Sequence, residues 1–294
     1  MNGSLGRDKV WNQQIWSDID KAVQEEVGRI RVAQKVFPST VVNNVLPVST
    51  KRIVPVGKLV PGPTPDEFQP FFEVSSDFQL TQAEVDGEED LHLATSFARS
   101  AASVIADAED RILFLGLGGS PAAVDVTNKP AIPPGFVAEA ANYKTPTFVA
   151  ADLSDILTAV RKGMAELNRR AQPGPYALFL SPNRYAQAFA QPAQGLLQTP
   201  GDQLDHVVTG GFYMVNSLPD ETGILVSLGG EPTRIILGTD AITAFTYTDA
   251  KGNYQFRVFE RIQMVVRDGR AFQTLTIGAS QTEGEGRRRV RRSV

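Results

Sequence analysis

Residues 88–119 read EEDLHLATSFARSAASVIADAEDRILFLGLGG and contain the most regular apolar pattern of the chain. Apolar side chains recur there every three or four positions: Ala94, Phe97, Ala101, Ile105, Ala108 and Ile112. Because this spacing is typical of one face of an α-helix, we predict a helix over residues 88–115, on the order of 40 Å long. Gly116 follows directly and is expected to end it, since glycine accepts the left-handed conformation common after a helix C-terminus.

The predicted helix carries its charges in two groups. Glu88, Glu89 and Asp90 stand at its start, where the helix macrodipole favours negative charge. The second group is interpreted as the solvent-facing side of the helix: Asp107, Glu109, Asp110 and Arg111.

The glycines at 116–119 raise the possibility of a phosphate-binding loop. A dinucleotide-binding fingerprint needs a strand before its glycines and a helix after them. Here a helix precedes the glycines, the next segment, SPAAVDVTNKPAIPPG, is rich in proline, and no GxxxxGK[ST] pattern occurs. The glycines are therefore interpreted as the start of a long loop, with a nucleotide enzyme kept as a minor alternative.

The composition restricts the chemistry. The chain has 294 residues, a net charge of -4, no cysteine and two histidines, so thiolate sites and a His-rich metal cluster within one chain are excluded. Ser120 and Ser181 lack the surroundings of a catalytic serine, so we expect no enzyme activity, no metal and no cofactor. Without an apolar leader or a long apolar run, a cytoplasmic protein without membrane or specific nucleic-acid partners is expected.

The N-terminal part combines a helix pattern with a proline-rich segment. Residues 8–31 predict a helix capped by Asp8, with one apolar stripe and Trp16 just beside it. The stripe either packs the helix on its own domain or also offers a groove to a partner. Residues 41–80 alternate short β-rich pieces with prolines, which favours edge strands or a hairpin arm. This segment is either an arm that pairs with a neighbouring subunit or a long surface loop.

The second half predicts a mixed α/β region followed by strands. A helix over 152–172, capped by Asp152, precedes a buried strand at 176–181, a short helix and a loop at 191–202. A further short helix near 203–210 precedes the terminal strands, with Asp268-Gly269 predicted as a hairpin turn. The arginine-rich tail is expected to be disordered.

Four stretches together resemble the family 1 encapsulins, the bacterial and archaeal shell proteins also described as linocin-type bacteriocins. They are DAEDRILFLG (107–116), GPYALFLSPNRYAQAF (174–189), GGFYMVNSLPDETGILVSLGG (210–230) and RIILGTDAITAFTYTDAKGNYQFRVFERI (234–262). The order of the predicted elements is also similar, over roughly residues 8–278.

The resemblance implies an α+β protein with the Hong-Kong-97-type fold of tailed-phage capsid proteins. The implied parts are an N-terminal helix region (1–40), an extended arm (41–80), a peripheral domain (81–150 and 250–278), an axial domain (151–249) and a disordered tail (279–294).

The resemblance also implies a function. Copies of the chain would assemble into an icosahedral nanocompartment in the cytoplasm. The shell would enclose a ferritin-like or peroxidase cargo enzyme, docked by its C-terminal peptide, and would serve iron storage or oxidative defence. The cargo-binding residues implied by position are Trp16, Ile19, Val23 and Arg29. The segment GRIR (28–31) departs from the Gly-Arg-Arg turn of many members, which affects this register.

A loop at the five-fold vertex would line a small, uncharged pore. Its implied residues are Gln191, Gln194, Leu196, Leu197 and Gln198. The alternative within the same fold is a phage or prophage major capsid protein, whose contents would be DNA.

Overall fold

The structure is a computed structural model that describes residues 5–42, 47–49, 68–119, 121–141, 147–149, 154–190 and 198–278. The chain divides into two compact units. Unit 1 comprises Met1–Glu139 and Leu228–Gly269, and unit 2 comprises Ala140–Ser227 and Arg270–Val294.

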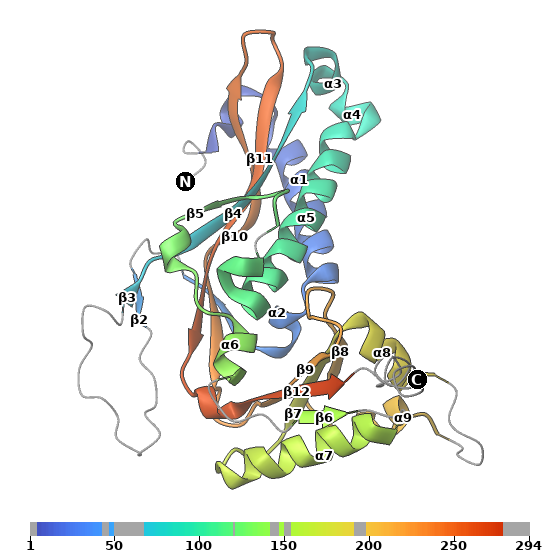
Figure 1. Cartoon of the computed structure of the whole chain (residues 1–294). Coiled ribbons are helices and arrows are strands. Elements are labelled where there is room, and N and C mark those ends of the chain that lie inside the picture. Colours follow the sequence, from blue (N-terminus) through green and yellow to red (C-terminus); the bar gives the residue numbers. More distant parts are fainter. Residues whose placement is uncertain are drawn as a thin grey trace, which may run out of the picture. The chain divides into compact units, whose positions relative to one another are not determined.

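Unit 1 is built on a five-stranded sheet with the strand order β1-β10-β11-β4-β5 (Figure 1). Its strands are β1 (Ser39–Val41), β4 (Phe72–Leu80), β5 (Asp125–Thr127), β10 (Thr233–Thr248) and β11 (Tyr254–Val266). β10 and β11 form a long antiparallel hairpin, and β4 pairs with β11 along its whole length. The stretches RIILGT and AITAFTY belong to one strand, β10, and register shifts in its pairing with β11 absorb the irregular part between them.

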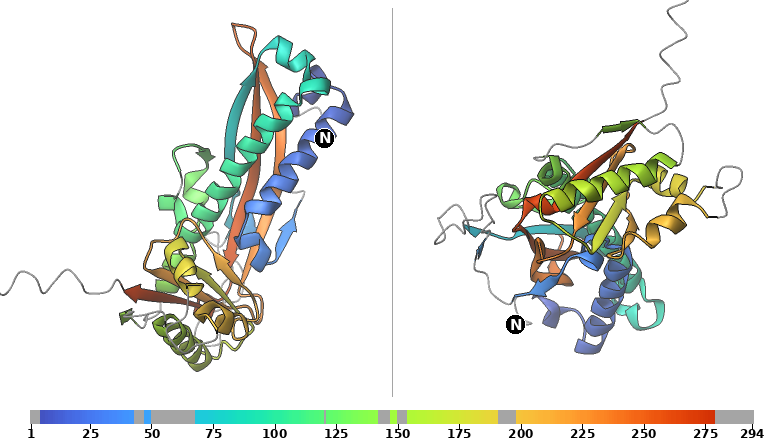
Figure 2. Two further views of the ribbon diagram at one scale, coloured as in Figure 1. Left: turned by 90° about the vertical axis from the view of Figure 1, so that its right-hand side faces the viewer. Right: turned by 90° about the horizontal axis from the view of Figure 1, so that it is seen from below.

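Two long helices, α1 (Gln13–Ile30) and α5 (Leu93–Leu115), run side by side along the strands of this sheet (Figure 2). Six of the twelve buried residues of α5 are alanines, and these small side chains allow close packing against neighbouring elements. The shorter helices of unit 1 are η2 (Arg7–Lys9), α2 (Ala33–Val36), α3 (Gln82–Asp86), α4 (Glu88–Leu91), η4 (Gly116–Gly119) and η5 (Lys129–Ala131). α6 (Phe136–Ala141) crosses the sequence boundary between the units.

The helix predicted over 88–115 is two helices. His92 adopts the left-handed conformation, with φ 50°, and separates α4 from α5. Glu88 takes over the capping of α5: its carboxylate accepts hydrogen bonds from the backbone N–H groups of Ala94 (2.6 Å) and Thr95 (3.1 Å). The acidic start therefore stabilises the helix by direct hydrogen bonds as well as by its charge. The predicted end at Gly116 is confirmed.

Two residues assigned to the solvent-facing side of this helix are buried. Glu109 is 0% exposed and Asp110 is 7% exposed. The prediction was wrong for both, because Arg31 pairs with Glu109, and the backbone N–H groups of Val32 and Ala33 donate to Asp110. Asp107 and Arg111 are paired with each other, one helical turn apart, and are partly exposed.

The predicted arm is shorter than residues 41–80. β4 lies inside the sheet of unit 1, between β11 and β5, and alternate side chains at its start are buried. The prolines precede this strand, so they do not interrupt its hydrogen bonds. Separate from this sheet, β2 (Val48–Ser49) and β3 (Phe68–Gln69) form a two-stranded antiparallel sheet. Residues 50–67 between them lie outside the described part of the chain.

Unit 2 contains a second five-stranded sheet, of order β6-β12-β9-β7-β8. Its strands are β6 (Thr147–Val149), β7 (Tyr176–Leu180), β8 (Phe212–Met214), β9 (Thr222–Ser227) and β12 (Phe272–Gly278). Its helices are α7 (Ser154–Arg169), α8 (Pro182–Ala188) and α9 (Pro200–Asp205). α7 packs Ile156, Val160 and Leu167 into a core shared with β9 and β12. The predicted strand at 176–181 and the helix after it are confirmed, whereas the predicted cap Asp152 lies outside the described residues.

One connection and the domain boundaries differ from what the sequence predicts. Asp268-Gly269 is not a hairpin turn: a 3-10 helix, η6 (Gly269–Ala271), follows there, and β11 and β12 belong to different sheets. Residues 228–249 group with unit 1 and residues 270–278 with unit 2, so the compact units differ from the implied boundaries at 150/151 and 249/250. The physical reason is that β10 pairs with β11, while β12 pairs with β9 and β6.

The end of α5 offers a matched test with two glycines. Gly116 has φ +71°, and a Cβ there would lie 2.5 Å from the carbonyl oxygen of Pro134. A Cβ on Gly118 would meet nothing within 4 Å. We expect Gly116→Ala to lower the free energy of unfolding by about 2–4 kcal/mol, from backbone strain and overlap, and Gly118→Ala to change it little. Denaturant unfolding followed by circular dichroism measures both, and equal stability of the two variants would contradict this account.

Candidate docking site beside the N-terminal helix

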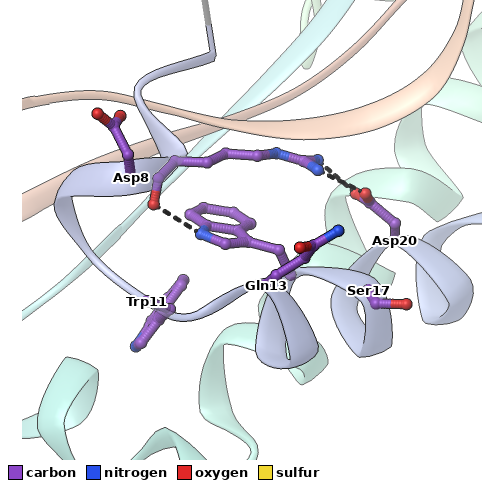
Figure 3. Close-up of a pocket in the computed structure, with 7 residues that line it drawn as sticks. Asp8, Trp11, Gln13, Ser17 and Asp20 are labelled. Carbon is purple, nitrogen blue, oxygen red and sulfur yellow. Dashed lines mark hydrogen bonds and ion pairs between the residues drawn. The ribbon is translucent and has the colours of Figure 1, made fainter. Parts of the chain in front are cut away.

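A pocket of about 420 Å³ lies where the chain turns into α1 (Figure 3). The residues that line it are Arg7, Asp8, Trp11, Gln13, Trp16, Ser17 and Asp20. The local sequence explains why α1 begins later than predicted. Asn12, not Asp8, is the N-cap, and its side chain accepts a hydrogen bond from the Ile15 N–H at 3.0 Å. Residues 7–9 instead form the separate turn η2.

The floor of the pocket is aromatic. Trp11 stacks on Phe256 of β11 with ring centroids 5.0 Å apart, and meets Trp16 edge-on at the same distance. Both indole N–H groups are satisfied: Trp11 donates to the carbonyl of Val85 and Trp16 to the carbonyl of Arg7, each at 2.9 Å. The rings are thus fixed in position and present hydrocarbon toward the pocket.

Arg7 forms one wall and is held from three directions. Its guanidinium lies 4.9 Å from the centre of the Trp16 ring, pairs with Asp20 at 2.6–2.7 Å, and donates to the Thr243 carbonyl. A cation on an aromatic face gains about 0.5–2 kcal/mol depending on its exposure. The pairing with Asp20 leaves this wall close to neutral, so a ligand need not carry a strong charge.

The rim is polar and accessible. Asp8, Gln13 and Ser17 are exposed, and Figure 3 shows them among the residues that line the pocket. An aromatic floor under hydrogen-bonding rim groups suits a short segment with apolar side chains and a polar backbone.

The structure places the four predicted cargo-binding residues in different environments. Trp16 lines the pocket but is only 3% exposed, while Ile19 and Val23 are each 0% exposed and pack α1 onto unit 1. These two have no surface to offer a ligand in this conformation. The Arg29 side chain is 70% exposed, pairs with Glu26 and lies near the other end of α1, outside the pocket lining.

Most pocket residues were missed from the sequence. Gln13, Ser17 and Asp20 recur at helical spacing beside the apolar stripe, and this polar row next to Trp16 was the one available signal. Arg7 could not be found this way, because its partners on β10 are more than two hundred positions away in the sequence.

The predicted pore loop is largely outside the described residues. This applies to Gln191, Gln194, Leu196 and Leu197, whereas Gln198 is described and exposed. The arginine-rich tail also lies outside them.

The candidate serine Ser181 has a structural partner, and the described residues offer no group suited to bind a metal ion. Ser181 is buried and donates its hydroxyl hydrogen bond to the Asp220 carbonyl at 2.8 Å. Within the described ranges, no group of three His, Cys, Asp or Glu side chains is placed to hold a metal ion. No helix in that part of the chain is both long and apolar enough to cross a membrane.

Comparisons with known proteins agree with the architecture. The family model "Linocin_M18: Encapsulating protein for peroxidase" matches residues 8–263. The type 1 encapsulin shell protein EncA of Myxococcus xanthus (strain DK1622) is 28% identical over 194 residues, 65% of this chain. This alignment spans 62% of the length of that relative.

Solved structures show the same fold at low identity. The virus-like particle from Pyrococcus furiosus has a TM-score of 0.63 and 15% identity, with 88% of this chain and 98% of that chain covered. A chain of Mycobacterium phage Bobi has a TM-score of 0.56 and 17% identity, with 87% and 91% covered. With the family match over most of its length and the two-unit α+β architecture described above, the chain belongs to the encapsulin shell-protein family and has the Hong-Kong-97-type capsid fold.

Proposed function

We propose that copies of this chain assemble into a closed icosahedral shell in the cytoplasm that encloses a cargo enzyme of the ferritin-like or peroxidase type. The observation that carries the proposal is the family match over residues 8–263, which coincides with a capsid fold covering 88% of the chain. Ferritin-like cargo would make the compartment an iron store, and peroxidase cargo would make it part of oxidative defence.

The small sheet of β2 and β3 supports assembly. In the described part of the chain these strands pair only with each other and join neither large sheet. Two strands of two residues cannot bury a core of their own. We assign residues 47–70 to an arm that gains its packing from a neighbouring copy, and obligate interfaces of this kind bury roughly 2,000–5,000 Å².

An aromatic patch on unit 2 supports contacts around a vertex. Tyr185, Phe189 and Phe212 stack with centroids 4.9–5.6 Å apart, while Phe189 and Met214 are each 43% exposed. Exposed aromatic clusters are typical of interfaces. Tyr185 and Phe189 precede the loop from Gln191 to Gln198, to which we assign the five-fold pore, and Phe212 and Met214 follow it.

The pocket beside α1 is our candidate for the cargo peptide. Its aromatic floor and polar rim fit a short apolar C-terminal segment of a cargo enzyme, as set out above. This assignment keeps the N-terminal helix as the docking element but moves contact from Ile19 and Val23 to Ser17, Gln13 and Trp11.

The competing function within the same fold is a phage or prophage major capsid protein, whose contents would be DNA. Expression of the full chain alone, followed by size exclusion and negative-stain microscopy, separates the two. Uniform hollow particles without scaffold or nucleic acid support the encapsulin shell. Monomers, or particles that form only around DNA, would overturn it.

Deletion of residues 47–70 tests the arm. We expect the deleted chain to lose particles and remain as small soluble oligomers, because the large units keep their own sheets and cores. Circular dichroism and a cooperative thermal transition would show that the units remain folded. Particles like those of the full chain would refute the arm assignment.

A large side chain substituted at the rim of the pocket tests cargo docking without creating a cavity in the core. Trp16→Ala is unsuitable because removing a buried tryptophan costs about 3–5 kcal/mol. Ser17 is exposed on the rim, so a large ring at this position would occupy the pocket while leaving α1 in place. We expect Ser17→Trp particles to co-purify with at most about a tenth as much cargo as the unmodified shell, the loss expected from about 1.4 kcal/mol of binding energy.

The matched control is Gln14→Trp, which adds the same ring at an exposed position of α1 outside the pocket lining. The cargo would be the ferritin-like or peroxidase protein encoded beside this chain in its genome, co-expressed with and without its C-terminal peptide. Equal cargo loading in Ser17→Trp and Gln14→Trp shells would place the docking site elsewhere.

A further inference from the structure

A buried cluster of charges inside unit 1 has no role in the function proposed above. Arg31, the C-cap residue of α1, is ion-paired with Glu109 of α5 and Glu260 of β11. Its Nη1 also lies 3.3 Å from Asp240 Oδ1 on β10. One guanidinium thus joins the end of α1 to a helix and two strands.

The neighbouring carboxyl, Asp110, holds the next piece of chain. Its two oxygens accept hydrogen bonds from the backbone N–H groups of Val32 (2.7 Å) and Ala33 (3.0 Å), where α2 begins. The Gln34 amide donates to Glu109 at 2.7 Å. Carboxyl groups of α5 therefore accept hydrogen bonds that attach the α1–α2 junction, residues 31–37.

The charges in the cluster do not balance. Glu109 and Glu260 are each 0% exposed and Asp110 is 7% exposed, while the Asp240 side chain is 37% exposed. Among the described residues, Arg31 is the one cation ion-paired with any of these four carboxyls. The nearest arginine on α5, Arg111, pairs with Asp107 instead. Three buried negative charges around one positive charge would carry a large desolvation cost, so a carboxyl there favours its neutral form.

Two further observations agree with a retained proton. Glu260 Oε1 is buried and has no hydrogen-bond partner in the described part of the chain. Burial, followed by the nearby charge of Glu109, raises the pKa of Asp110 from 3.8 to about 7. Burial also raises the pKa of Glu109 against the opposing pull of Arg31. Because these groups interact strongly, the proton belongs to the cluster and not to one residue.

We propose that the cluster is a proton-dependent latch: one proton shared among Glu109, Asp110 and Glu260 keeps the α1–α2 junction docked on α5, and its loss loosens the junction. The latch is independent of what the shell contains, and it would operate in a single subunit as well as in a particle.

The direction of the pH dependence follows from the pKa shift. A carboxyl whose pKa is higher in the docked state than in the open state stabilises docking when protonated. For Asp110 this contribution is complete below about pH 4 and is lost as the pH rises through about 7, above which it stays constant. We therefore expect the junction to open more readily at pH 8 than at pH 5.

Hydrogen–deuterium exchange on the full chain measures this opening directly. After correction for the intrinsic exchange rate, we expect the protection of amides at 31–37 to fall at least about tenfold between pH 5 and pH 8. Peptides from β7 and β9 of unit 2 serve as the internal reference and are expected to change little. If the protection of residues 31–37 in the unmodified chain does not depend on pH, this result overturns the proposal without any variant.

Two variants make the test specific. Glu109→Gln removes one buried negative charge beside Asp110, so the change in protection between pH 5 and pH 8 should shrink several-fold. Asp107→Asn removes one negative charge at a partly exposed position of the same helix and should leave the change intact. An equal pH dependence in Glu109→Gln and Asp107→Asn would show that the buried cluster is not the titrating group.

Discussion

The arrangement of unit 1 depends on the side chain of Arg31. Its guanidinium is the shared partner of carboxyl groups from α5, β10 and β11, and Glu260 lies 229 positions away in the sequence. Trp16, Ile19 and Val23 pack α1 onto unit 1, and the ion pairs of Arg31 add a directional contact at the C-terminal end of the helix. A buried ion pair is sensitive to geometry, and removal of one partner typically costs about 3–5 kcal/mol. Arg31 therefore sets the position of α1 along the sheet.

The geometry of the candidate docking pocket also depends on contacts with the β10–β11 hairpin. Its floor consists of Trp11 and Trp16, which both pack on Phe256 of β11, and Arg7 donates a hydrogen bond to the carbonyl of Thr243 on β10. Both ends of the N-terminal segment contact the same β10–β11 hairpin. Polar contacts are made at each end, through Arg7 at the start of the segment and Arg31 at the end of α1. The apolar stripe between them packs α1 onto unit 1, and the two arginines fix the position of the segment along the hairpin.

Local sequence patterns predicted the elements of the fold well where one segment decides its own structure. The helices around residues 13–30 and 154–169 and the strand at 176–180 follow from the apolar spacing, and the helix end at Gly116 follows from the glycine, although Asp8 was wrongly predicted as the cap of α1. The errors occur where a distant segment decides the outcome. β4 was assigned to the arm because short β-rich pieces alternate with prolines in residues 41–80. In the structure β4 pairs with β11 along the whole length of β4. Asp268-Gly269 has a turn composition, but the strands on either side belong to different sheets.

The same distinction explains what the sequence missed in the buried charge cluster and in the candidate docking site. A helical pattern assigns Glu109 and Asp110 to solvent, because isolated carboxylates are costly to bury. Only a cation from elsewhere in the chain reverses this assignment, and Arg31 is 78 positions before Glu109 by number. Ile19 and Val23 were predicted to lie on the apolar stripe of α1 and Trp16 beside it, but the sequence does not say that the chain covers all three itself. Burial of the apolar stripe leaves the exposed polar row beside it as the accessible side of α1, so a ligand would meet Ser17 and Gln13 before it met the stripe.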